Sequence, residues 1–247
     1  MTQSPSPPSP DQQESGKRAA GEAALDCIQD GALVGLGTGS TVKYFLLALG
    51  ERVKAGLRVH GVPTSRETAK LAEQLQIPLL PEEGEWELDV AVDGADQVDS
   101  QFHLIKGGGG ALLREKIVAA AARTFIVLVD PTKCVPVLGK PMPVPVEVNP
   151  FGWPQTAKQL RALGGVPTLR EKHGKIFETD GGHYILDWLV DSIPDPVQLE
   201  ARLNRIPGVV ENGLFVNRTS TLIIGSPDGV QIKHNSFSST SSTRQDS

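Results

Sequence analysis

The chain has 247 residues, of which 39% are hydrophobic and 21% are charged, as is typical of a globular protein. This length suits one large domain, or one domain that carries a smaller lobe. The formal net charge of −5 gives no general affinity for nucleic acid or for an anionic membrane. No apolar run approaches the ~20 residues needed to span a bilayer, and the N-terminus does not resemble a secretory signal. We therefore expect a cytoplasmic protein without nucleic-acid or membrane partners.

The two cysteines, Cys27 and Cys134, are too few for a disulfide framework, and they lack the spacing of metal ligands. The five histidines are scattered, with no pair at ligand spacing. Cys134 follows Lys133, but no histidine or acid is placed by the sequence to activate it as a nucleophile. We expect Cys134 to be structural, and we expect no metal site.

The two ends of the chain cannot bury enough apolar surface to offset the entropy of ordering them. Residues 1–15 are mainly Ser, Pro, Gln and acids, and the C-terminal end is mainly Ser, Thr and Asn. The composition therefore predicts disordered tails at residues 1–15 and 234–247.

Between the tails, segments with helical spacing of apolar residues alternate with short apolar strands. This alternation predicts an α/β fold with a Rossmann-like, mostly parallel sheet and helices on both faces. In such sheets, ligands bind beyond the carboxyl ends of the strands. The predicted helices cover 17–29, 41–49, 65–75 and a segment ending at 122, and the predicted strands cover 32–36, 57–62, 88–93 and 124–129.

Residues 141–210 have a different pattern, which predicts a small inserted α+β (ferredoxin-like) lobe. The region begins with Pro-Met-Pro-Val-Pro-Val-Glu-Val, which is too rich in proline for a central strand. Helices at 156–163 and 196–204 and short strands near 168–170 and 184–187 are predicted to follow. The α/β catalytic domain then comprises 16–140 and 211–233, and the chain returns to the main sheet at 213–216 and 221–225.

Four consecutive glycines, Gly107 to Gly110, link an apolar stretch to a helix-forming sequence. Glycine runs cost backbone entropy, so they occur where the chain turns sharply or where a ligand approaches closely. Lys106 precedes the run, and the free N–H groups of the following helix favour an anion. Glu115 has apolar neighbours at three and four residues, which raises its pKa toward that of a general base. The alternative is a tight turn followed by an exposed glutamate.

A second glycine-rich segment, Gly35-Leu36-Gly37-Thr38-Gly39-Ser40-Thr41, offers amides and three hydroxyls at a predicted helix start. These groups suit a phosphate monoester, and a capped glycine turn is the alternative. A dinucleotide fingerprint would need glycine where Ser40 stands, and the Gly-Lys-Ser/Thr of a P-loop is absent. Lys17 and Lys133 could complete this polar set, although a single lysine is more often a solvated surface residue.

The segment Asp93-Gly94-Ala95-Asp96 ends a predicted strand and has three interpretations. Two acids three residues apart could bind Mg²⁺ together with a substrate phosphate. They could also form a turn and a helix cap, which is the common role of Asp beside Gly. The third interpretation is recognition of sugar hydroxyls combined with proton transfer.

Together, these segments resemble ribose-5-phosphate isomerase of the type A family. The resemblance covers roughly residues 16–233, in order and without large gaps, which is more specific than any single glycine loop. Gly110 stands where the family commonly has alanine, and this difference predicts a looser turn. The matching motifs are Gly-Thr-Gly-Ser-Thr at 37–41, Asp-Gly-Ala-Asp at 93–96, Lys-Gly-Gly-Gly at 106–109, Leu-x-Arg-Glu-Lys at 112–116, Pro-Val-Glu-Val at 145–148, Ile-Pro-Gly-Val-Val at 206–210, Gly-Leu-Phe-x-Asn-Arg at 213–218 and Pro-Asp-Gly-Val at 227–230.

The resemblance implies interconversion of D-ribose 5-phosphate and D-ribulose 5-phosphate through an enediol, in the non-oxidative branch of the pentose phosphate pathway, without a cofactor. It implies that Glu115 moves the proton between C1 and C2, and that Asp93 with Asp96 handles sugar hydroxyls and ring opening. Lys106 and the glycine amides would stabilise the oxyanion. A homodimer or a dimer of dimers is also implied. The implied substrate-binding residues are Lys17, Thr38, Gly39, Ser40, Thr41, Asp93, Gly94, Ala95, Asp96, Lys106, Gly107, Gly108, Gly109 and Lys133.

The main alternative is a non-catalytic sugar-phosphate sensor or binding domain of related fold. Such domains are normally joined to a helix-turn-helix segment, and residues 1–16 are too short and too rich in proline to form one. A CoA transferase would need its catalytic glutamate in a different motif and usually a longer chain. A purely structural role does not account for Lys106 and Glu115, which flank the glycines.

Overall fold

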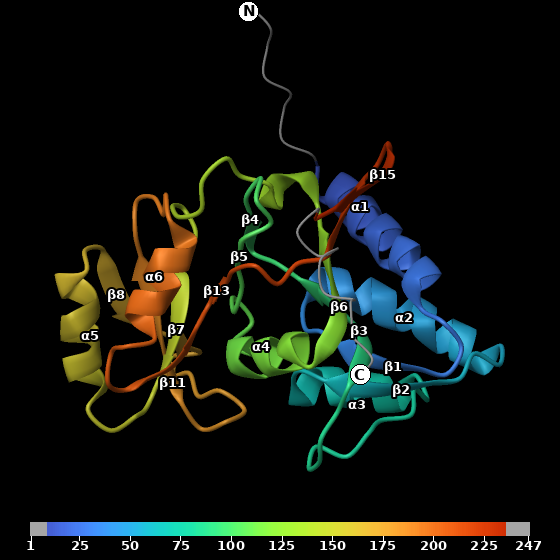
Figure 1. Ribbon diagram of the computed structural model, residues 1–247, viewed down its shortest axis with the longest axis horizontal. Coiled ribbons are helices and arrows are strands. Elements are labelled where there is room, and N and C mark those ends of the chain that lie inside the picture. The colour runs from blue at the N-terminus through green and yellow to red at the C-terminus, as the bar shows by residue number, and fades with distance from the viewer. Residues whose placement is uncertain (1–8, 236–247) are drawn as a thin grey trace, which may run out of the picture.

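The computed structural model describes residues 9–235, so the predictions for residues 1–8 and 236–247 lie outside the described part of the chain. The strands of the central sheet are β1 (Ala32–Leu36), β2 (Val59–Pro63), β3 (Leu88–Gly94), β6 (Ala122–Val129), β14 (Thr221–Ser226) and β15 (Gly229–His234). Their order is β15-β14-β6-β3-β1-β2 (Figure 1). All of them run parallel except β15, which pairs antiparallel with β14 at one edge.

Helices cover both faces of this sheet, which confirms the predicted α/β fold. α1 (Pro10–Ala23) and α2 (Ser40–Lys54) pack on one face, α4 (Leu112–Ala120) packs on the other, and α3 (Arg66–Gln74) lies beside β2. Along β3, Val90 and Val92 join the core under α1 and α2, whereas Ala91 joins the core under α4. Strands buried on both faces are characteristic of parallel sheets. None of the helices in residues 9–235 is long and apolar enough to cross a membrane.

The first helix begins at Pro10, so the prediction of a disordered tail reaching residue 15 is wrong for residues 10–15. Ser9 and Gln12 form a capping box at its start. The Gln12 N–H donates to Ser9 Oγ (3.3 Å), and the Ser9 N–H donates to Gln12 Oε1 (2.8 Å). These bonds satisfy backbone donors that the helix itself leaves without partners.

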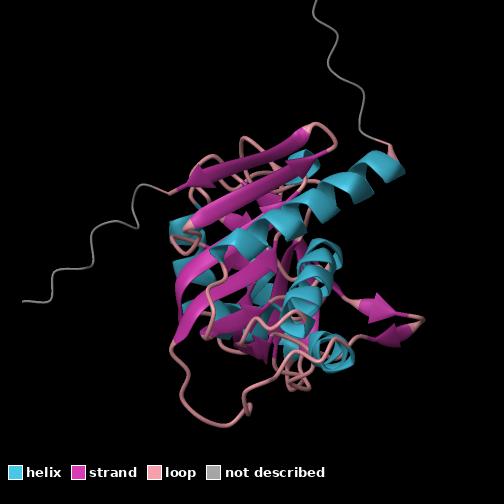
Figure 2. Cartoon of the chain, turned by 90° about the vertical axis from the view of Figure 1, so that its right-hand side faces the viewer, coloured by secondary structure: helices cyan, strands magenta, loops and turns pink. Residues whose placement is uncertain are grey.

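Tertiary packing explains why this polar segment is ordered. Gly16 of α1 lies against Gly225 of β14, and a Cβ atom on Gly16 would stand only 2.6 Å from the Gly225 carbonyl oxygen. The absence of side chains on both residues lets the helix approach the strand at backbone distance. Figure 2 shows α1 as the long helix that lies along the last two strands of the sheet.

The inserted lobe is an antiparallel sheet of β7 (Val144–Val148), β8 (Val166–Leu169), β11 (Tyr184–Leu189) and β12 (Val209–Asn212), with the order β12-β7-β11-β8. α5 (Trp153–Ala162) and α6 (Pro196–Leu203) pack on it around a core that includes Trp188. The β-α-β-β-α-β succession is the ferredoxin-like arrangement that the sequence predicts. A short hairpin of β9 (Glu171–Lys172) and β10 (Lys175–Ile176) interrupts it. Because β12 belongs to this sheet, the lobe extends to residue 212 rather than 210.

One expectation for the lobe is wrong, because β7 is a central strand although a proline-rich segment leads into it and Pro145 lies within it. Pro145 is the second residue of β7, and the pairing with β12 starts only at Val146. The Pro145 carbonyl accepts a hydrogen bond from the Gly213 N–H (2.7 Å). The N–H group that proline lacks therefore falls near the end of the strand, where a ladder bond is least needed.

A small antiparallel sheet lies between the two units. It consists of β4 (Gln97–Val98), β5 (Leu104–Ile105) and β13 (Leu214–Phe215), in the order β13-β5-β4. The predicted return of 213–216 to the main sheet is therefore wrong, because these residues pair with β5 instead. The Lys106 N–H donates to the Gly213 carbonyl (2.9 Å), so this pairing fixes the start of the glycine-rich turn.

We expect the Gly16→Ala substitution to lower the free energy of unfolding by about 1–3 kcal/mol, because the new methyl group must push α1 away from β14. The better helix propensity of alanine offsets at most about 1 kcal/mol of this loss. Urea denaturation measures the difference. Ser15→Ala, at an exposed position of the same helix, is the matched control and should cause no loss. A Gly16→Ala protein as stable as the control would contradict the close contact.

Candidate active site

The predicted site residues gather at the carboxyl ends of β1, β3 and β6. All of them except the buried Asp93 line a cavity of about 170 Å³, together with residues of α1 and of the glycine-rich turn. A larger cavity, of about 230 Å³ on the other side of Gly110, has mainly apolar walls and contains none of the predicted residues. The predicted residues that line the polar cavity are Lys17, Thr38, Gly39, Ser40, Thr41, Gly94, Ala95, Asp96, Lys106, Gly107, Gly108, Gly109, Glu115 and Lys133.

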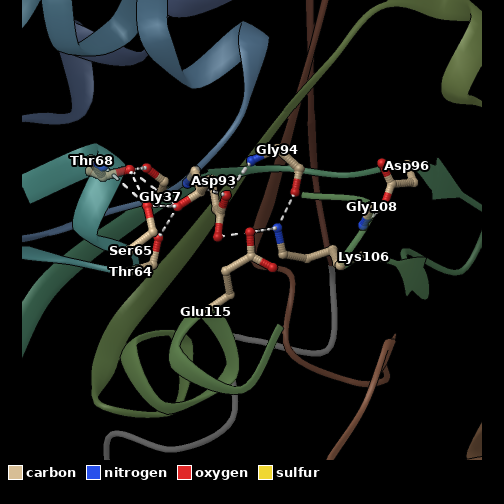
Figure 3. Close-up of polar contacts among 12 residues, drawn as sticks. Gly37, Thr64, Ser65, Thr68, Asp93, Gly94, Asp96, Lys106, Gly108 and Glu115 are labelled. Carbon is tan, nitrogen blue, oxygen red and sulfur yellow. Dashed lines mark hydrogen bonds and ion pairs between the residues drawn. The ribbon is translucent and has the colours of Figure 1, made fainter. Parts of the chain in front are cut away.

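The centre of the site is a buried cluster of Lys106, Asp93 and Glu115 (Figure 3). The Lys106 Nζ atom lies 3.1 Å from Asp93 Oδ2 and 3.4 Å from Glu115 Oε1. It also donates to the Gly94 carbonyl (2.5 Å). The three side chains come from the end of β3, the residue after β5 and the first turns of α4, so neighbouring segments of the chain supply the cluster.

Glu115 has the environment that its helical neighbours predict. Its exposed fraction is 5%, and burial raises the pKa of its carboxyl group to about 8, although the nearby Lys106 ammonium lowers it. The remaining carboxylate oxygen, Oε2, is buried and has no hydrogen-bond partner among the described residues. One oxygen of Glu115 thus faces a cation, while the other has no partner among residues 9–235.

The pKa values of the other two members of the cluster, Asp93 and Lys106, are also shifted. Burial raises the pKa of Asp93, although Lys106 and the backbone N–H groups of Gly94 and Thr38 lower it. Burial alone would lower the pKa of Lys106, but Asp93 and Glu115 outweigh this effect and leave it raised. Lys106 therefore stays protonated while it faces two carboxylates, and the cluster has more acidic groups than cations.

Asp93 and Asp96 are held by protein donors. Asp93 Oδ1 accepts from the N–H groups of Gly94 (2.7 Å) and Thr38 (3.1 Å), and Asp96 Oδ2 accepts from the Gly108 N–H (2.8 Å). These bonds fit the turn interpretation, and Asp96 also pins the glycine-rich turn. Within residues 9–235, no group of three or more His, Cys, Asp or Glu side chains could hold a metal ion.

The N-terminus of α2 forms the end of the cavity that is suited to bind an anion. This helix starts at Ser40 behind Gly39, and no side chain in the described part of the chain caps its first turn. Its first amides therefore face the cavity beside the Ser40 and Thr41 side chains. Lys17 and Lys133 line the same cavity. The amides, the hydroxyls and the two cations suit a dianion.

Thr38 has a different environment from the one predicted. Its hydroxyl forms hydrogen bonds with the hydroxyls of Thr64 (2.7 Å), Ser65 (2.8 Å) and Thr68 (3.1 Å), which link the loop to α3. Its N–H is bound by Asp93, as described above. Thr38 therefore supports the loop, and the groups of the loop that remain for an anion belong to residues 39–41.

The cavity has three further polar lining residues that the sequence analysis missed: Gln13, Asp130 and Thr132. Gln13 was assigned to a disordered tail, but the capping box brings it into α1. The Ser-x-x-Gln spacing at Ser9 was the signal that could have revealed it. Asp130 caps the turn after β6 by accepting from the Thr132 N–H (2.8 Å).

Comparison with known proteins agrees with this geometry. The profile of the family described as ribose 5-phosphate isomerase A (phosphoriboisomerase A) matches residues 60–229. A relative named ribose-5-phosphate isomerase A, from Gloeobacter violaceus, is 50% identical over 217 residues, covering 87% of this chain and 94% of the relative. Another relative of the same name, from Agrobacterium fabrum, is 50% identical over 222 residues, which cover 87% of this chain and 96% of the relative.

Solved structures give the same result. A D-ribose-5-phosphate isomerase in complex with phospho-erythronic acid is 43% identical, with a TM-score of 0.86, covering 90% of this chain and 98% of that one. Ribose 5-phosphate isomerase A from Methanocaldococcus jannaschii is 40% identical, with a TM-score of 0.86, and the match covers 90% of this chain and 99% of that one. Sequence and fold agree, and the chain belongs to the ribose 5-phosphate isomerase A family.

Proposed function

We propose that this chain interconverts D-ribose 5-phosphate and D-ribulose 5-phosphate through an enediol, and that Glu115 is the base that carries the proton. The observation that carries the proposal is the state of the Glu115 carboxyl group. It is buried, Oε1 lies near Lys106, Oε2 has no partner among residues 9–235, and the pKa is raised to about 8. A carboxyl group whose pKa lies near the working pH can both take and return a proton.

The reaction needs one proton to move between adjacent carbons. In the open-chain aldose, Glu115 removes the proton from C2, and the electron pair shifts onto the C1 carbonyl oxygen. The protonated Glu115 then returns the proton to C1, while a carbonyl forms at C2 and the hydroxyl proton passes from O2 to O1. The atoms balance without an external acid, oxidant or reductant.

The negative charge of the enediolate requires donors that are already in place. Lys106 and the amides of the glycine-rich turn line the cavity beside Glu115. In a buried site, such preorganised donors stabilise developing charge more strongly than water does. Asp93 and Asp96, at the end of β3, would bind the sugar hydroxyls and assist ring opening.

The phosphate of the substrate would occupy the N-terminus of α2, against Gly39, Ser40 and Thr41, with Lys17 and Lys133 supplying charge. The relative in complex with phospho-erythronic acid supports this proposal, because its ligand carries a phosphate group. This arrangement places the phosphate at one end of the cavity and the reacting carbons near Glu115.

Replacement of Glu115 by Gln should lower kcat about 10²–10⁴-fold, because the amide cannot accept the proton from carbon. Its affinity for phospho-erythronic acid should stay within about threefold of that of the unmodified protein, since the two side chains have the same shape. Turnover of ribose 5-phosphate and calorimetric binding measure the two effects. Glu73→Gln, at an exposed position on α3, is the control. Near-normal turnover by Glu115→Gln would refute the role of this residue.

The raised pKa of Glu115 makes kcat/KM depend on pH. Only the deprotonated carboxylate accepts the proton, and with a pKa of about 8 the deprotonated fraction falls as the pH falls below that value. We expect kcat/KM to fall by about tenfold per unit on the acid side and to level off above pH 8. Initial rates between pH 6 and pH 9 test this expectation. A profile that is flat over this range would contradict the buried state of the base.

Ser40→Ala and Thr41→Ala should each raise KM about tenfold with little change in kcat, because a hydrogen bond to a charged group contributes about 1.5–3 kcal/mol. The phosphate is remote from the reacting carbons, so it is bound similarly in the ground state and the transition state. Steady-state kinetics measure both constants, with the exposed Ser192→Ala in the lobe as the control. Loss of kcat at an unchanged KM would place these hydroxyls at the reacting carbons instead.

We also propose that the chain forms a homodimer or a dimer of dimers through the lobe. Two large apolar side chains of the lobe, Phe151 and Val166, have exposed fractions of 91% and 62%. Such groups are typical of protein interfaces. Light scattering should give at least twice the mass of the chain, and Phe151→Ser should shift the mass toward the monomer. Ile232→Ser, on β15, is the control. A monomeric unmodified protein would exclude this assembly.

A further inference from the structure

Arg170, the residue after β8 in the lobe, reaches the glycine-rich turn of the catalytic site. Its Nη1 atom donates to the carbonyl oxygens of Gly107 (2.9 Å) and Gly108 (3.1 Å). Asp187 of β11 holds the other edge of the guanidinium group, with 2.8 Å between Nε and Oδ2 and a second bond from Nη2 to Oδ1. The guanidinium group thus bridges a carboxylate of the lobe and two carbonyls of the turn.

These bonds determine where the amides of the turn point. In a trans peptide, the C=O and N–H groups point in opposite directions. Holding the carbonyls of Gly107 and Gly108 therefore fixes the N–H groups of Gly108 and Gly109. The Gly108 N–H meets Asp96 beside Lys106 (Figure 3). The Gly109 N–H has no acceptor among the residues that the structure describes, and Gly109 lines the cavity.

We propose that Arg170 is a positioning residue, which aims the Gly109 N–H at the enediolate oxygen and so couples the lobe to catalysis. The inference rests on the proposed isomerase function. Arg170 does not line the cavity, so it acts through the turn rather than on the substrate. A cation on a carbonyl also polarises the peptide group, which makes its N–H a stronger donor. Arg170 therefore sets the direction of the Gly109 N–H and, through its charge, makes that N–H a stronger donor.

The chemistry of this contact requires arginine. The planar guanidinium group binds the Asp187 carboxylate along one edge while Nη1 reaches two carbonyls, and its face lies over the Phe177 ring at 5.8 Å. A lysine ammonium could keep the ion pair with Asp187, but it cannot serve these acceptors in a fixed plane. Arg170→Lys is therefore the informative substitution, because it keeps the charge and removes the geometry.

The test compares two phosphorylated probes in the unmodified and Arg170→Lys proteins. Phospho-erythronic acid has a planar, anionic carboxylate that resembles the enediolate, whereas erythritol 4-phosphate has a neutral hydroxyl in its place. We expect affinity for the acid to fall about tenfold or more, and kcat to fall about 10–100-fold, since loss of a whole oxyanion donor costs about 10²–10³-fold. Affinity for erythritol 4-phosphate and KM should change less than about threefold. Arg161→Lys, exposed on α5, is the control.

Equal weakening of both probes would show that Arg170 only holds the lobe in place, and would overturn the proposal. So would unchanged kcat and unchanged affinity for the acid. If Arg170→Lys does not fold, Asp187→Asn replaces it, because this substitution keeps the arginine and weakens its anchor. Equal weakening of both probes, or unchanged kcat with unchanged affinity for the acid, would overturn the proposal in this variant too. Failure of the isomerase proposal is separate, because it would appear as no turnover by the unmodified protein, whereas the comparison of probes needs no turnover.

Discussion

The shared ammonium group of Lys106 is the constraint on which the site depends. It lies within 3.4 Å of carboxylate oxygens of both Asp93 and Glu115, and none of the three residues is more than 5% exposed. Burial of an ion costs several kcal/mol unless a partner compensates, and here one cation must compensate two acids. Burial outweighs this single cation, so the pKa values of both Asp93 and Glu115 stay raised. The two acids differ in their other partners, because two backbone N–H groups hold Asp93 Oδ1, whereas Glu115 Oε2 has no partner among residues 9–235.

The segment that follows the lobe in the sequence fixes the position of Lys106. Lys106 follows β5, which pairs with β13, and β13 comes after the whole lobe in sequence. The bond from the Lys106 N–H to the Gly213 carbonyl makes the strand that leaves the lobe a support for the lysine. The lobe is therefore part of the catalytic framework as well as a separate packing unit. Its own core, around Trp188, stabilises the segment that fixes Lys106.

The sequence predicts those features that local patterns encode. The apolar spacing around Glu115 predicts a buried carboxyl group, and the alternation of strands and helices predicts the sheet whose carboxyl edge carries the site. The pairing of 214–215 with β5 has no local signal, because β13 and a strand of the main sheet look alike over two residues. The packing of α1 likewise depends on Gly225, some 200 residues away from Gly16, so composition alone assigns the residues around Gln13 to a tail.

The environment of Gly110, the fourth glycine of the turn, depends on tertiary contacts that the sequence alone does not predict. The resemblance described under Sequence analysis implies alanine at the position of Gly110, and the loss of a side chain predicts a looser turn. Its φ of +86° suits glycine, and the Phe177 ring fills the space that a Cβ would occupy. That ring also lies under the Arg170 guanidinium, which binds the carbonyls of Gly107 and Gly108. The lobe thus supplies, through Phe177 and Arg170, the restraint that the extra glycine removes. The rigidity of the turn is a tertiary property, set by residues more than sixty positions away.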